Sequence, residues 1–242
     1  MKQYKRFLLL LPLLYSCSTF ENGYDYNPEE ISSHPFVQEA RAYFEEYTSI
    51  PVEYELQGMH PGAIAAKWDK DLKIFSQFGT LCVNVDLETE ATYDAEFYKR
   101  GADGLISTED TYTTALFQRL IVVQGEESGY FSCYIVTVIP DEEHATMNRS
   151  KVGEMVYCAD PMTRFSGFLL FATVMTNYGI ELQCYKDGNM YHKISIYDLP
   201  SITWFGWDDT LKEIRHYLGM KSVTQHIPAG TFVIPVEEED EG

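Results

Sequence analysis

The chain has 242 residues and a formal net charge of −19, with 37 Asp and Glu residues against 18 Lys and Arg residues. A polyanion of this size is repelled by nucleic acid and by anionic lipid surfaces, so nucleic acid is excluded as a partner. Hydrophobic residues make up 45% of the chain and aromatic residues 14%, which excludes disorder for its bulk because this content can build a core.

The first 16 residues predict a secretion signal. A basic cluster, Lys2, Lys5 and Arg6, precedes an apolar run from Phe7 to Leu14. This run is far shorter than the roughly 20 apolar residues that a membrane-spanning helix needs, so it is typical of a signal peptide.

Cys17 follows the apolar run, with Ser16 directly before it and Leu14 three positions before it. This pattern resembles the lipobox of bacterial lipoproteins, in which the cysteine is lipidated and becomes the new N-terminus. More than one acyl chain on Cys17 would anchor the protein stably. We therefore expect a lipid-anchored protein of the cell envelope at the outer membrane, on either its periplasmic or its surface face. The alternative is an ordinary signal peptide with an incidental Cys17. Removal of the signal leaves 15 basic against 37 acidic residues, a net charge near −22.

The remaining chain divides into three parts. Residues 17–33, rich in Asn, Gly and Pro, predict a flexible tether, and residues 34–236 predict a single α+β domain. The last segment, 237–242, reads EEEDEG and predicts a disordered acidic tail, because its like charges cannot pack.

An amphipathic helix is predicted at the start of the domain, where Val37, Ala40, Phe44 and Tyr47 recur at helical spacing and Pro51 ends the pattern. Residues 52–80 read as irregular. A second, short helix is predicted at 208–218, ended by Gly219, and a last strand at 231–236.

Between the helices the sequence predicts strands. Residues 81–87 alternate apolar and polar positions, and 115–141 read as a hairpin around the loop 125–129. Residues 165–174 form another strand, and 180–185 and 190–197 flank the tight-turn dipeptide Asp187-Gly188. Since no crossover helix separates these strands, the sheet is expected to be mainly antiparallel, with an N-terminal helix before it and a short C-terminal helix after it.

The helix EARAYFEEY, the later Trp68, the hairpin QRLIVVQGEESGYFSCYIVTVIPD and the strand FSGFLLF leading into LQCYKDGNMYH together resemble a group of uncharacterised Bacteroidetes cell-surface lipoproteins. The resemblance covers roughly residues 36–198 and implies a strand-rich surface lipoprotein. It supplies no activity, because these motifs are patterns of core and turn.

Motifs for catalysis or cofactors are absent. The sequence has no His-Glu-x-x-His, Gly-x-Ser-x-Gly, Cys-x-x-Cys or dinucleotide-binding pattern, and we expect no cofactor. Glycosidases need only two carboxylates at a suitable separation, so an unmarked hydrolase stays open.

Two polar features carry alternative interpretations. Asp141-Glu142-Glu143-His144 offers metal ligands, but such a cluster after a strand usually faces water, so no metal is expected. His192 and His226 stand in apolar surroundings and read as packing or turn residues rather than catalysts.

Trp204, Phe205 and Trp207 are the candidate binding residues, because aromatic side chains are the usual anchors for a sugar or a protein; core packing is the alternative. Thr210 lies in Asp-Thr-Leu, which resembles the acceptor of Bacteroidetes O-glycosylation, although Asp209 also reads as a helix cap.

Four cysteines follow the signal and Cys17: Cys82, Cys133, Cys158 and Cys184. Outside the cytoplasm they permit disulfides, with three possible pairings. Cys133 and Cys184 lie in the middle of two predicted strands, so a bridge between them is geometrically possible; buried free thiols are the alternative.

The sequence thus predicts an envelope module that binds a glycan, a peptide or an envelope partner, with an envelope hydrolase as the alternative. Exposed aromatic side chains on an open face would favour binding, and a cleft where two carboxylates, or a histidine and a nucleophile, converge would favour hydrolysis.

Overall fold

A computed structural model describes residues 31–48, 62–69, 72–77, 80–101, 105–125, 129–156, 165–174, 179–195 and 218–227. The signal peptide, Cys17, the predicted strand at 231–236 and the acidic tail lie outside these residues. So does the predicted helix 208–218, except for its last residue, Leu218.

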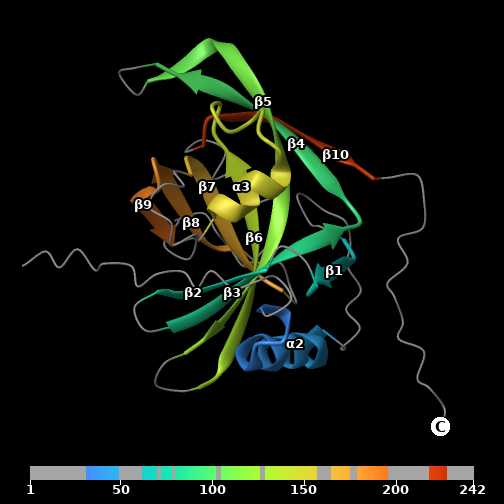
Figure 1. Cartoon of the computed structure of the whole chain (residues 1–242). Helices are drawn as coiled ribbons and strands as arrows, with labels where there is room; N and C mark the ends of the chain where they lie inside the picture. Colours follow the sequence, from blue (N-terminus) through green and yellow to red (C-terminus); the bar gives the residue numbers. More distant parts are fainter. Residues whose placement is uncertain are drawn as a thin grey trace, which may run out of the picture.

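The described part is strand-rich, with a mostly antiparallel sheet and few helices (Figure 1). The helices are α2 (Pro35–Thr48) and α3 (Arg149–Met155). The strands are β1 (Ile64–Lys67), β2 (Lys73–Gln77), β3 (Thr80–Thr89), β4 (Thr92–Arg100), β5 (Ile106–Gln124), β6 (Phe131–Pro140), β7 (Gly167–Thr173), β8 (Gly179–Lys186), β9 (Asn189–Ser195) and β10 (Met220–His226).

Several predicted elements correspond to observed ones. The first helix is α2, the alternating segment 81–87 lies in β3, and the two hairpins are β5–β6 and β8–β9. Asp187 and Gly188 both have positive φ, 50° and 76°, as a tight hairpin turn requires.

Other elements were missed. The prediction of irregular structure at 52–80 is wrong for β1 and β2, which are too short to show a periodic pattern. The strands β4 and β10, the first half of β5 and the helix α3 were not predicted. Ile31, assigned to the tether, is buried against α2 and so belongs to the folded part.

β5 organises the sheet because two different strands pair with successive parts of one of its edges. Residues 111–116 of β5 pair with β4, and residues 119–124 pair with β3, while the other edge pairs with β6. β4 also carries β10 on its outer side. The pair β4–β10 therefore forms a wing, seen at the upper right of Figure 1, that leaves the main sheet at the middle of β5.

Side chains alternate between two buried faces of the main sheet. On one face, Leu120 and Ile135 pack under α2, whereas Leu170 and Leu182 pack under the wing. On the other face, Ile121, Val136 and Leu169 pack against α3, which lies across the strands in Figure 1. Both faces are covered by apolar contacts, so the sheet forms the centre of the core.

Gly167, at the start of β7, should not tolerate a side chain. It has φ 142°, and a Cβ atom there would lie 2.3 Å from the carbonyl oxygen of Ile139. We predict that Gly167→Ala lowers the free energy of unfolding by about 2–5 kcal/mol through strain and clash.

Gly129→Ala is the matched control, because Gly129 also has positive φ, 66°, but a Cβ atom there would have no neighbouring atom within 4 Å. Its cost should be about 1–2 kcal/mol, from the backbone conformation alone. Urea denaturation measures both values, and equal losses would contradict the close approach at Gly167.

Candidate functional site

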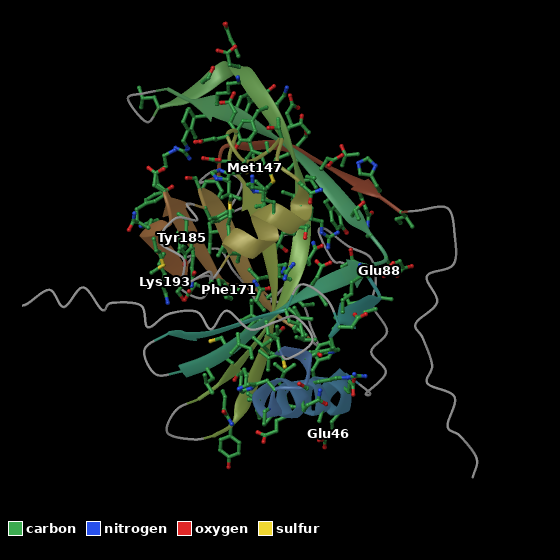
Figure 2. All side chains as sticks on the ribbon, viewed as in Figure 1. Glu46, Glu88, Met147, Phe171, Tyr185 and Lys193 are labelled. Carbon is green, nitrogen blue, oxygen red and sulfur yellow. The ribbon has the colours of Figure 1, made fainter. Side chains whose placement is uncertain are left out.

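A cleft of about 860 Å³ lies between the wing and the end of the main sheet. Its walls come from β4, β5, the turn after β6, β7, β8 and β9. The lining residues are Tyr98, Arg100, Gly101, Tyr112, Asp141, Glu142, Glu143, Gly167, Phe168, Tyr185, Lys186, Tyr191 and Leu218. Figure 2 labels Tyr185 at this end of β8, on the same side of the molecule as Lys193 of β9.

Tyr112 anchors the aromatic wall. Its ring stacks on Phe97 of the wing, with centroids 5.5 Å apart. Burial raises the pKa of Tyr112 far above its usual value, and the carboxylates of Asp141 and Glu142 raise it further. The hydroxyl therefore stays protonated at physiological pH and is available as a hydrogen-bond donor.

Tyr191 reaches the cleft because β9 bulges. Cys184 pairs with His192, but the next residue of β8, Tyr185, pairs with Met190, so Tyr191 is an extra residue in the ladder. Regular alternation would place Tyr191 and His192 on opposite faces, whereas both line cavities on the same side. Tyr191 is 62% exposed, so most of its ring is open to a ligand.

The acidic turn Asp141–His144 forms the opposite wall. The Nδ1 atom of His144 lies 2.7 Å from Oδ1 of Asp141, and the backbone N–H of His144 donates to the same oxygen. His144 is only 5% exposed and its ring packs near Phe165. The expectation that this cluster faces water is therefore wrong for His144, which is a buried partner of Asp141.

Among the residues that the structure describes, Asp141, Glu143 and His144 could hold a metal, since one ligand atom from each lies within 4.8 Å of the others. Asp141 already has two other partners, however: its Oδ1 bonds to His144, and its Oδ2 lies 3.8 Å from Nζ of Lys186. Both carboxylate oxygens of Asp141 thus have protein partners, and this geometry does not require a cation.

A second cavity of about 330 Å³ adjoins the cleft. It shares Arg100, Phe168, Tyr191 and Leu218 with the cleft. Its other lining residues are Leu182, Cys184, His192 and Ile194, so it is mainly apolar. The two cavities therefore form one continuous surface, in which the cleft carries polar groups among its aromatic walls and the smaller cavity is mainly apolar.

The possible disulfide bridge between Cys133 and Cys184 is not formed in the structure. Both are free thiols, and β7 lies between their strands, β6 and β8. Cys133 packs against the core under α2, whereas Cys184 belongs to the core under the wing. Sequence order made the strands seem close, but the intervening strand separates them.

The histidines are not where the sequence suggested. His192 is exposed and lines the smaller cavity, and His226 is exposed on β10, with Nε2 2.9 Å from Oδ2 of Asp94. Both are exposed strand residues, so the interpretation as packing or turn residues is wrong for both.

The candidate binding residues Trp204, Phe205 and Trp207 lie outside the described residues, as do Cys158 and Thr210. The cleft residues Tyr98, Arg100 and Tyr112 were missed. The only sequence signal near them was the alternation of Tyr93, Ala95 and Phe97 with polar residues, which marks a strand but not a site.

Comparison of the chain with models of known families, with curated proteins and with solved structures finds no significant match. In the described part of the chain, no helix combines the length and apolar character needed to cross a membrane. The cleft must therefore be interpreted from its own geometry.

The free thiols lead to a prediction. Burial raises the pKa of Cys82 and of Cys133 to about 12 and that of Cys184 to about 11. Because only the thiolate is nucleophilic, these cysteines should not react with a thiol reagent at pH 8 in the folded protein. A chain with Cys17 and Cys158 replaced by serine should release three reactive thiols on denaturation without reductant. A lower count would reveal a bridge among Cys82, Cys133 and Cys184.

Proposed function

We propose that this chain is an α+β ligand-binding module of the cell envelope and that the tyrosine-lined cleft is its binding site. The observation that carries the proposal is the bulge of β9, which directs the exposed Tyr191 to the cleft that Tyr112 also lines. Bulges recur where a side chain must be re-aimed beside a functional site. Aromatic side chains that bring large contact area and a hydroxyl are favourable binding anchors.

The charges of the cleft suit recognition. Glu143 is exposed at its wall, while Glu142 bonds to Lys99, which lies outside the lining. Arg100 and Lys186 supply positive groups to the same surface. A cavity with apolar walls and a few polar groups of both signs is typical of a ligand site. The ligand classes that the sequence proposed, a glycan, a peptide or an envelope partner, all fit this description.

Hydrolysis is the second candidate function. Asp141 lines the cleft together with two further carboxylates, Glu142 and Glu143, and the buried His144 lies behind it, with Nδ1 2.7 Å from Oδ1 of Asp141. A histidine oriented by a carboxylate is a common general base. Within the described part of the chain the ring of His144 bonds to Asp141 and not to a nucleophile, which is why binding is preferred.

We also propose that the resemblance to Bacteroidetes surface lipoproteins holds and that Cys17 anchors the module to the outer membrane. Two or more acyl chains on one residue give stable anchoring, so Cys17→Ala should remove the protein from the detergent phase in a partition assay. Unchanged partitioning of the variant would refute anchoring through Cys17. Trp204, Phe205 and Trp207 remain a separate proposed contact surface.

The binding function can be tested with Tyr191→Ala. The variant should lose retention on a combined array of envelope glycans and peptides, since it removes the most exposed aromatic ring of the cleft. It should melt at the same temperature as the original protein, because a 62% exposed side chain contributes little to the core.

Tyr130→Ala is the matched control: Tyr130 is 78% exposed on the β5–β6 hairpin and does not line the cleft. This variant should bind as the original protein does. Equal binding by all three proteins would refute the cleft as the site. Steady hydrolysis of the same ligands, lost in Asp141→Asn, would replace binding with the hydrolase alternative.

A further inference from the structure

Arg100 stands where the two cavities meet. It is an exposed residue at the end of β4, and it lines both the cleft and the smaller cavity. Its positive charge opposes the burial-driven rise in the pKa of Tyr112 in the cleft and of Cys184 in the smaller cavity. The guanidinium therefore acts electrostatically on groups in both cavities, which agrees with its position between them.

The smaller cavity has room for an aliphatic side chain. Leu182, Cys184 and Ile194 form its apolar part, and its volume is about 330 Å³. Leu182 is completely buried and Cys184 is 5% exposed, so the floor is fixed by the core under the wing. A preformed apolar pocket of this kind gains affinity from an apolar group without reorganising.

The cleft on the other side of Arg100 combines aromatic walls with hydrogen-bonding groups. Tyr112 presents a protonated hydroxyl, and Glu142 and Glu143 present carboxylates. These groups match the amides and amines of a peptide backbone or side chain, whereas an acyl chain offers them no hydrogen bond. In order along the surface there is thus an apolar pocket, a guanidinium and a hydrogen-bonding cleft.

We propose that the ligand is the C-terminal end of a peptide whose last residue is apolar. Its α-carboxylate would bind the Arg100 guanidinium, its last side chain would fill the smaller cavity, and the preceding residues would lie along Tyr112 and Glu143. Arg is the side chain best suited to a carboxylate because its planar group donates two parallel hydrogen bonds. This inference rests on the proposed function of the cleft and names its ligand class.

The test uses the mature chain and tetrapeptide libraries with three randomised positions and a fixed last residue, leucine or aspartate. Each library is offered with a free carboxylate and with a C-terminal amide, and affinity is measured by calorimetry. The library that ends in leucine with a free carboxylate should bind best. Replacing the carboxylate of this library by an amide should weaken the affinity about tenfold or more, since a hydrogen bond to a charged group is lost.

Arg100→Gln should bind the free-acid and amide libraries equally, because the group that distinguishes them is gone. Lys151→Gln is the matched control: it also removes one positive charge, but from an exposed position on α3, outside both cavities. It should keep the preference of the original protein. Melting temperatures of both variants should match the original, as both side chains are exposed.

Four results would overturn the proposal. Equal binding of acid and amide libraries by the original protein would exclude carboxylate recognition. Stronger binding of decanoate or of free leucine than of the peptide libraries would assign the site to a fatty acid or an amino acid. Glycan binding that is lost in Tyr191→Ala, without peptide binding, would refute the peptide but keep the binding function. If no ligand of any class binds through the cleft, both the inference and the proposed function fail.

Discussion

The buried guanidinium of Arg119 is the constraint on which the sheet depends. Arg119 is 2% exposed on β5, and its Nε donates to Oδ1 of Asn84 on β3 at 2.7 Å. One of its terminal nitrogens lies 3.3 Å from Asp86, which Arg149 of α3 also approaches. Burying a charge is costly unless it is paired and hydrogen-bonded, so β3, β5 and α3 must keep this arrangement together. The close fit extends to Gly153, where a Cβ atom would lie 2.9 Å from the guanidinium.

The position of Arg119 in β5 links this network to the cleft. Arg119 pairs with Asp86 at the first register position that β5 shares with β3, and Leu116, three residues earlier, is the last to pair with β4. The buried network therefore holds β5 where the strand changes partners and where the wing departs. Because the cleft opens between that wing and the sheet, we expect the polar cluster under α3 to influence the separation of the two walls from the opposite face. Asn84 completes the link, since its side-chain amide donates to the carbonyl of Val156 directly after α3.

The sequence predicted those parts of the fold that local chemistry determines. The β8–β9 hairpin follows from Asp187 and Gly188, and α2 follows from helical spacing ahead of a proline. β10 was not predictable in this way, since it pairs with β4 at a sequence separation of more than a hundred residues, as the bond from Lys221 to Glu96 across 125 positions shows. The candidate site was not predicted for the same reason. Among the contacts described for it, only the one between Asp141 and His144 is local in sequence, and the position of Tyr191 depends on a bulge that leaves no periodic signal.

The overall charge and the cleft act over different distances. A net charge of −19 repels an approaching carboxylate at long range, but salt screens exposed charges beyond about 8–10 Å. Within the cleft the balance is local, because Lys186 lies near Asp141, and Glu142 bonds to Lys99. A carboxylate that arrives there meets Arg100 beside Tyr191 and Phe168, whose bulk displaces water and strengthens a direct hydrogen bond. Arg100 would therefore hold a bound ligand by direct contact rather than attract it from a distance. Its loss should change the rate of dissociation of the ligand more than the rate of association.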